Sequence, residues 1–123
     1  MTTTEKNAEI ARFMGLQTGR ELGYDRWHQD WFDNRGVING QRNDKLLFHS
    51  DWNWLCLVVE KIEELKYPVD IFKKAVSIHL DNGEPIVDLS GNNYNTKIEA
   101  VHEAVYQFIV WYNKNKDNES QMY

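Results

Sequence analysis

The chain has a single cysteine and no long apolar run, and each of these shortages excludes a class of protein. One thiol, Cys56, makes neither an intrachain disulfide nor a Cys-based zinc site, and its apolar neighbours predict a small core residue. No stretch approaches the roughly 18 apolar residues of a membrane span, and the polar residues 1–6 lead into no signal-peptide run. We therefore expect a cytoplasmic protein with no membrane association.

Catalytic signatures are missing as well. The chain contains no Gly-x-Ser-x-Gly motif, no phosphate-binding glycine loop before a helix and no Cys/His nucleophilic pair. The sequence therefore predicts no catalytic residue and no cofactor, and it favours a non-enzymatic protein over an enzyme. A carboxylate pair working as acid and base stays open, because the 19 acidic residues offer many chance pairs.

The length and the charge distribution of the chain indicate its domain number and its partners. At 123 residues the chain is long enough for one core and too short for two ordinary ones, so we expect a single domain over residues 1–123. The net charge of −5 argues against a general phosphate-binding surface. All five Arg residues lie in the neutral residues 1–45, whereas residues 46–123 hold seven Lys against twelve acids and carry the whole deficit.

The N-terminal part combines one helix with a long irregular region. Apolar residues between Ala8 and Met14 predict a short helix, and Gly15 fits a left-handed helix terminator, so residues 1–15 form the first segment. Residues 16–44 contain four Gly, four Arg and several large aromatic side chains without a sustained period. Loops of this length inside compact domains are usually functional or disordered, and the aromatic content favours order.

Residues 45–113 form the predicted core. Ser50 is a favourable N-cap with Asp51 in the first turn behind it, and an apolar stripe at helical spacing follows. Trp54 and Leu57 widen this stripe, which suggests that the helix is buried on more than one side.

A change of period marks the next segment. Apolar and polar residues alternate over residues 69–71, 76–80 and 86–89, which is the pattern of half-buried strands. The pair Asn82-Gly83 between the second and third runs readily supplies the positive φ values of a tight hairpin turn. The sequence therefore predicts a three-stranded antiparallel meander.

A final helix closes the predicted fold. Thr96 and Glu99 form a Thr-x-x-Glu capping box, and the apolar residues from Ile98 to Tyr112 fit a period of 3.6 residues. Residues 114–123 read as a polar tail. The expected fold class is α+β: a small two-layer domain whose three-stranded antiparallel meander packs against two main helices, with an N-terminal helix and a long irregular loop.

Two stretches of the chain carry a resemblance. The first reads His-Ser-Asp-Trp-Asn-Trp-Leu from His49 and continues with Val-Val-Glu-Lys-Ile from Val58; the second reads Ala-Val from Ala104 and Phe-Ile-Val-Trp-Tyr-Asn from Phe108. The chain resembles, in these motifs, a group of small uncharacterised proteins common in Bacteroidetes genomes and their phages. The resemblance implies a phage or mobile-element setting, in which some small proteins inhibit host defences, CRISPR nucleases among them.

Arginine and large aromatic side chains gather in the irregular region. These types carry a disproportionate share of energy at protein interfaces, and they also stack on unpaired bases and clamp phosphates. The alternative to a binding surface is a structural role. In it the aromatic rings fold inward as a small core under the loop, and the Arg side chains are solvated. The candidate partner-binding residues are Arg20, Tyr24, Arg26, Trp27, Trp31, Phe32, Arg35 and Arg42.

Histidine and aspartate residues offer a weaker alternative. A metal site would draw on His28, Asp30, His49 and Asp51. Their spacing matches no recognised metal motif such as His-Glu-x-x-His, so we expect no metal, and His49 and Asp51 fit roles at the start of the central helix. His79 and His102 are predicted to be surface residues.

The function favoured by the sequence is that of a non-enzymatic protein-interaction protein with a protein or ribonucleoprotein partner. The resemblance narrows this expectation to a phage or mobile-element inhibitor of a bacterial defence complex such as a CRISPR nuclease. The alternatives are a metal-assisted hydrolase using the His/Asp cluster and an RNA-contacting accessory protein. A homo-oligomer in which Trp54 and Trp111 extend the helical faces outward is a further alternative.

Overall fold

The computed structural model describes residues 2–18, 21, 30–32, 41–42, 46–89 and 94–122. It divides the chain into two compact units, residues 1–48 and residues 49–123, which are described in turn. Helices and antiparallel strands are both present, so the predicted α+β class is confirmed. The expected single domain over residues 1–123 stays a prediction.

The first unit begins with helix α1 (Thr3–Phe13). Thr2 is its N-cap, and the Thr2 hydroxyl accepts a hydrogen bond from the backbone N–H of Glu5 at 3.1 Å. Gly15 follows the C-cap residue Met14, and its φ of +90° confirms the predicted left-handed terminator. Asn7 is 2% exposed on the inner face of α1, and its Nδ2 donates to the backbone carbonyl of Leu46 at 3.1 Å.

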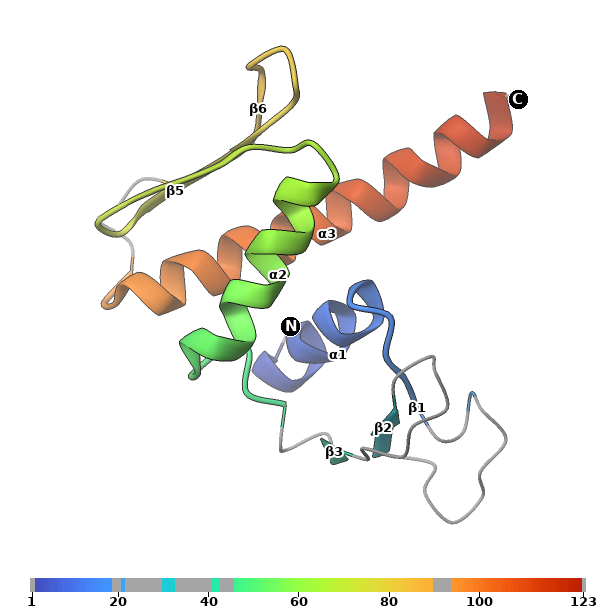
Figure 1. The fold of residues 1–123 in the computed structure, drawn as a ribbon, viewed down its shortest axis with the longest axis vertical. Helices are drawn as coiled ribbons and strands as arrows, with labels where there is room; N and C mark the ends of the chain where they lie inside the picture. Colours follow the sequence, from blue (N-terminus) through green and yellow to red (C-terminus); the bar gives the residue numbers. More distant parts are fainter. Residues whose placement is uncertain are drawn as a thin grey trace. The chain divides into compact units, whose positions relative to one another are not determined.

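A small three-stranded sheet occupies part of the region predicted to be an irregular loop. Strands β1 (Gln17–Thr18), β2 (Asp30–Phe32) and β3 (Gln41–Arg42) pair antiparallel in that order (Figure 1). These strands lie within the region predicted to be loop-rich, and the sequence did not predict them. Strands of two or three residues are too short to show an alternating pattern, and their partners lie far apart in sequence, so periodicity misses them.

The second unit opens with helix α2 (Trp52–Glu64). Its N-cap is Asp51, whose Oδ1 accepts a hydrogen bond from the backbone N–H of Asn53 at 2.8 Å. The predicted cap, Ser50, is therefore one residue too early. Aspartate and serine are comparably good N-caps, so the local sequence alone does not decide between neighbours.

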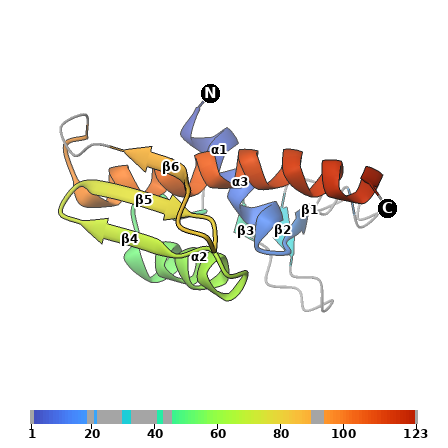
Figure 2. The ribbon, with the colours of Figure 1, turned by 90° about the horizontal axis from the view of Figure 1, so that it is seen from above.

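Three strands follow in a meander. Strands β4 (Val69–Phe72), β5 (Ala75–His79) and β6 (Pro85–Leu89) pair antiparallel in the order β4-β5-β6 (Figure 2). The loop between β5 and β6 contains Gly83 at φ +93°, as the Asn-Gly pair predicts. The predicted three-stranded antiparallel meander is thus confirmed.

Helix α3 (Lys97–Met122) closes the chain. The Thr96 hydroxyl accepts from the backbone N–H of Glu99 at 3.3 Å, and the Glu99 carboxylate accepts from the backbone N–H of Asn95 at 3.2 Å, so the predicted capping interaction forms. Residues 114–122, which belong to the predicted polar tail, continue this helix. No Gly or Pro follows Lys97 in the sequence to stop it.

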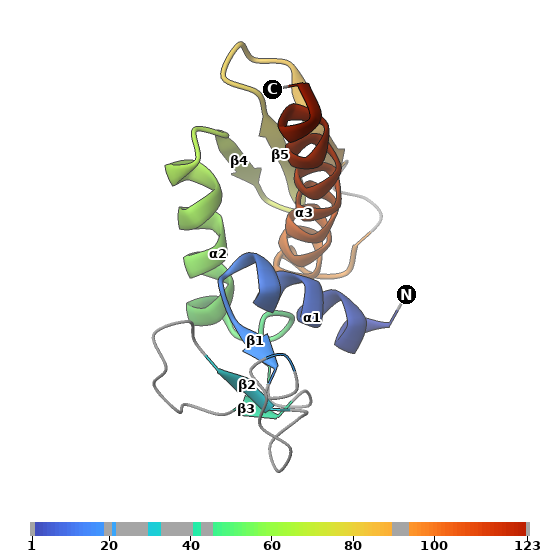
Figure 3. The ribbon, with the colours of Figure 1, turned by 90° about the vertical axis from the view of Figure 1, so that its right-hand side faces the viewer.

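The second unit has two layers. Helix α2 packs against β4 and α3 packs against β5 and β6, and the two helices also touch each other, so both cover one face of the sheet (Figures 1 and 3). Alternate residues of the strands point into this layer. The buried apolar side chains of the unit are Leu55, Val58, Ile62, Val76, Ile78, Val87, Ala100, Val101, Ala104, Val105, Phe108 and Ile109.

Candidate functional site

The Arg and aromatic residues predicted to bind a partner fall largely outside the described part of the chain. Only three of them have a described backbone, and those three lie in paired strands, where Trp31 is opposite Gln41 and Asp30 is opposite Arg42. Their side chains are not among those described. The remaining predicted residues, outside the described ranges, are Arg20, Tyr24, Arg26, Trp27 and Arg35; the three in strands are Trp31, Phe32 and Arg42.

Two members of the alternative metal site have described side chains, and both have structural roles. Asp51 caps α2, and the His49 ring meets the His102 ring edge-on, with centroids 6.2 Å apart. Within the described residues no group of three or more His, Cys, Asp or Glu side chains could hold a metal ion. His28 lies outside the described residues, as does the side chain of Asp30.

His102 is buried, with 6% of its surface exposed, so the prediction of a surface residue is wrong. It lies on α3 between Val101 and Ala104, both of which are fully buried. The apolar stripe of α3 is therefore wider than the aliphatic residues alone indicate. A histidine at the edge of such a stripe is amphipathic enough to be buried when another ring, here that of His49, packs on it.

The open face of the sheet brings a serine, a histidine and an aspartate together without forming a catalytic relay. His79 Nε2 lies 2.9 Å from Ser77 Oγ and 3.5 Å from Asp70 Oδ2. A serine hydrolase triad instead uses the two different ring nitrogens for Ser and Asp. Here both neighbours share Nε2, and the buried Nδ1 has no hydrogen-bond partner in the described structure. The arrangement is therefore not that of a Ser-His-Asp triad.

The outer face of α2 presents an apolar surface that the sequence did not predict. Leu57 is 57% exposed and Trp52 is 38% exposed, and Cys56 between them is exposed too. Cys56 and Leu57 lie on the side of the helix away from the stripe of Leu55 and Val58, whereas Trp52 lies at the edge of that stripe, next to Leu55. The predictions of a buried Cys56 and of a buried second side at Leu57 are therefore wrong.

The same face becomes acidic toward the end of the helix. Glu60, Glu63 and Glu64 are exposed there, on the part of the helix surface between the directions of Trp52 and Leu57. We call this surface the outer face of α2; its exposed members are Trp52, Asn53, Cys56, Leu57, Glu60, Glu63 and Glu64. It combines an apolar N-terminal half with a negatively charged C-terminal half.

A pocket lies between the C-terminal end of α2 and helix α3. Its volume is about 140 Å³, and it is lined by Leu65, Tyr67, Trp111, Tyr112, Asn115 and Lys116. Trp111 is half-buried in this aromatic surface, and Trp54 on α2 is half-buried too. A homo-oligomer formed through these two rings stays a prediction.

Comparison of the chain with protein-family models, with curated proteins and with solved structures found no match. Among the described helices, none is long and apolar enough to cross a membrane.

Proposed function

We propose that the protein is a non-enzymatic interaction protein that binds a partner protein through the outer face of α2. The observation that carries the proposal is the exposure of Trp52, Cys56 and Leu57 in the first two turns of a regular helix. Exposed aromatic and aliphatic residues at helical spacing are the anchors with which helices enter apolar grooves of other proteins. Large apolar side chains that gather in this way mark interaction sites more often than single exposed ones do.

The acidic half of the face defines the chemistry of the partner. Glu60, Glu63 and Glu64 add three negative charges beside the apolar anchors. A complementary surface has an apolar centre and a rim of Lys or Arg, which would speed encounter and fix the orientation of the helix. Surfaces of this kind occur in proteins that bind nucleic acids, because phosphate binding requires basic residues.

A bacterial defence complex such as a CRISPR nuclease is a partner of that chemistry. The resemblance to small proteins of Bacteroidetes and their phages supports this choice, and a helix that occupies a basic groove would act as an inhibitor by excluding nucleic acid. The Arg and aromatic residues between Arg20 and Arg42 are proposed as a second contact region, since their composition is that of an interface.

The experiment is a pull-down from a defence-bearing host, followed by affinity measurement with the purified partner. We expect one stoichiometric protein or ribonucleoprotein partner. Leu57→Ala should weaken its binding about tenfold or more, because central apolar anchors dominate interface energies. Glu63→Lys should weaken binding and reduce its salt dependence.

The matched control is Phe72→Ala. Phe72 is 72% exposed, more than Leu57, but it lies on β4 outside the outer face of α2, so this variant should bind within about twofold of wild type. If Leu57→Ala and Glu63→Lys bind as wild type while Trp27→Ala and Arg26→Ala do not, the interface lies in residues 20–42 and not on α2. Recovery of no partner by any form of the protein would remove the interaction function altogether.

A further inference from the structure

The pocket at the C-terminal end of α2 is built from aromatic rings set at steep angles. The Tyr67 ring lies 5.8 Å from the Trp111 ring at 80° and 6.2 Å from the Tyr112 ring at 82°, measured between centroids. These three rings form an aromatic corner. The fully buried Phe108 ring packs behind it, with its centroid 5.1 Å from that of Tyr67, and stacks on the Tyr112 ring. The corner therefore offers ring faces in two directions, which suits a flat aromatic group.

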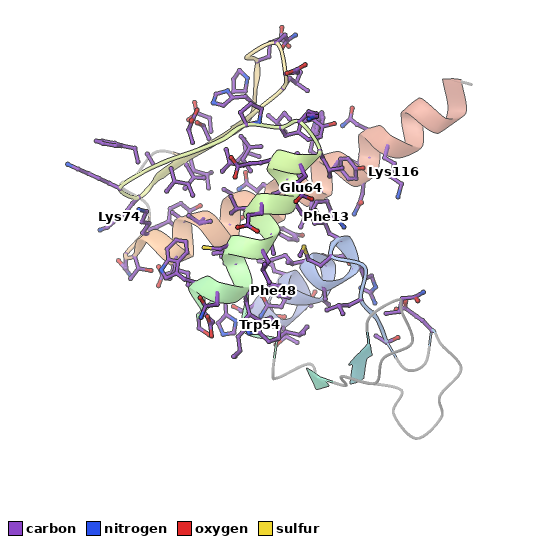
Figure 4. All side chains as sticks on the ribbon, viewed as in Figure 1. Phe13, Phe48, Trp54, Glu64, Lys74 and Lys116 are labelled. Atoms are coloured by element: carbon purple, nitrogen blue, oxygen red, sulfur yellow. The ribbon has the colours of Figure 1, made fainter. Side chains whose placement is uncertain are left out.

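One cationic side chain lines the pocket beside these rings. Lys116 lines the pocket on α3, while Glu64 lies on the neighbouring helix α2 (Figure 4). Burial lowers the pKa of the Lys61 ammonium below its ordinary value; Glu64 opposes this effect, and the charge of Lys116 adds to it. Among the lining residues Lys116 alone is charged, so the lining carries one positive charge. A quaternary ammonium ligand, which an uncharged aromatic cage would bind, is disfavoured, and an anion is favoured.

An oriented amide completes the lining. Asn115 Nδ2 donates to the backbone carbonyl of Trp111 at 2.8 Å, and this bond fixes the plane of the amide at the pocket wall. The amide oxygen can then accept a hydrogen bond from an N–H group of a ligand. Aromatic faces, a cation and a fixed amide are the three kinds of group with which proteins hold an unpaired base and its phosphate.

The size of the pocket matches one aromatic ring. Its volume is about 140 Å³, close to the roughly 150 Å³ of an engineered cavity that holds one benzene molecule. The six-membered ring of a pyrimidine base fits such a space. The phosphate of the same nucleotide would then lie outside the ring corner, within reach of the Lys116 ammonium.

We propose that this pocket binds a pyrimidine nucleotide, with the base against Trp111 and Tyr112, an N–H of the base donating to Asn115, and the phosphate beside Lys116. This function is additional to partner binding by α2, and no residue of the outer face of α2 lines the pocket. The ligand is a free mononucleotide or a nucleotide of a single strand, since both present the same base and phosphate.

Calorimetric titration of the full chain with uridine 5′-monophosphate and with octauridylate tests the proposal. We expect at least one of them to bind, uridine to bind more weakly than its monophosphate, and inorganic phosphate alone not to compete. Lys116→Gln should weaken binding of the active ligand about fivefold to tenfold, because it removes a charged contact. Lys114→Gln, the matched control, changes an exposed lysine on the same helix that does not line the pocket and should leave binding within about twofold.

Uridine 5′-monophosphate and octauridylate distinguish a free nucleotide from single-stranded nucleic acid as the source of the ligand. Binding of the mononucleotide assigns the site to a free metabolite, and binding of octauridylate alone assigns it to single-stranded nucleic acid. The proposal is overturned if neither probe binds at millimolar concentration, if phosphate alone displaces the nucleotide, or if Lys116→Gln and Asn115→Ala both bind as wild type. Circular dichroism of each variant confirms that α3 is intact, so that a loss of binding reports the pocket.

Discussion

Lys66 occupies at the end of α2 the same position that Gly15 occupies at the end of α1. In each case the residue has a left-handed backbone, with φ of +77° at Lys66 and +90° at Gly15. The N–H of the following residue bonds to a carbonyl five positions back, from Tyr67 to Ile62 at 3.3 Å and from Leu16 to Ala11 at 2.9 Å. Both helices therefore end in a Schellman motif, once with glycine and once with lysine.

The two ends predict opposite responses to substitution. A side chain at a left-handed position costs about 1 kcal/mol or more, because Cβ crowds the following carbonyl oxygen. Lys66→Gly should therefore raise the free energy of unfolding by about 0.5–1 kcal/mol, and Gly15→Ala should lower it by about 1 kcal/mol. Chemical denaturation of both variants measures the changes. A loss of stability in Lys66→Gly would mean that the Lys66 side chain makes a contact worth more than the relief of strain.

Asn7 provides a second prediction, in the first unit. Its buried amide donates to the carbonyl of Leu46, which is 39 positions away in sequence. Asn7→Ala removes this donor from a buried site and should destabilise the protein by about 1–3 kcal/mol. Asn7→Asp should cost at least as much, because a carboxylate cannot donate to the carbonyl and buries a charge.

The control for Asn7 is Asn53→Ala at an exposed position of α2, where we expect a change below about 0.5 kcal/mol. Hydrogen exchange of the α1 amides locates the effect. If Asn7→Ala leaves both the unfolding midpoint and the exchange of α1 unchanged, the bond to Leu46 does not hold this helix in place.

Lys61 makes stability depend on pH. Burial lowers the pKa of its ammonium from the ordinary value of 10.5, so the folded state releases this proton at a lower pH than the unfolded state does. Between the two pKa values the unfolded state binds more protons, and the contribution of Lys61 to stability rises with pH through that window. Below the window both states are protonated and the folded state bears the full cost of burying the charge.

Replacing the ammonium should therefore stabilise the protein at neutral pH. We expect Lys61→Met to have a higher free energy of unfolding than wild type at pH 7, and the difference should shrink as the pH approaches 10.5. Urea denaturation at a series of pH values measures both, and the comparison with wild type cancels the titration of other groups. Lys97→Met, at an exposed position, is the control. A difference that grows with pH would contradict the sign of the shift.

Elements whose signals are local could be predicted from the sequence. The helical period of α3, its Thr96 and Glu99 cap, the Asn-Gly turn of the meander and the terminator Gly15 each depend on residues close together in the chain. Backbone geometry and short-range hydrogen bonds fix such features wherever they occur. The α+β class followed from them.

The candidate sites could not be predicted in the same way. Whether a residue on the flank of a helix is buried depends on what packs beside it, which is why Cys56 and Leu57 are exposed while His102 is buried. The sequence directed attention to residues 20–42, and that prediction stands without a test. The aromatic content that signalled an interface there is present in the pocket too, but Tyr67 and Trp111 are 44 positions apart and carry no common local pattern.

The sequence by itself determined the helices, the meander, their order and the absence of familiar catalytic motifs, because periodicity and capping act over a few residues. Only the tertiary structure decided which side of α2 faces outward and that Tyr67, Trp111 and Lys116 line one pocket. The reason is physical: burial and proximity arise when the helices pack on the sheet, and packing joins residues that no local signal connects.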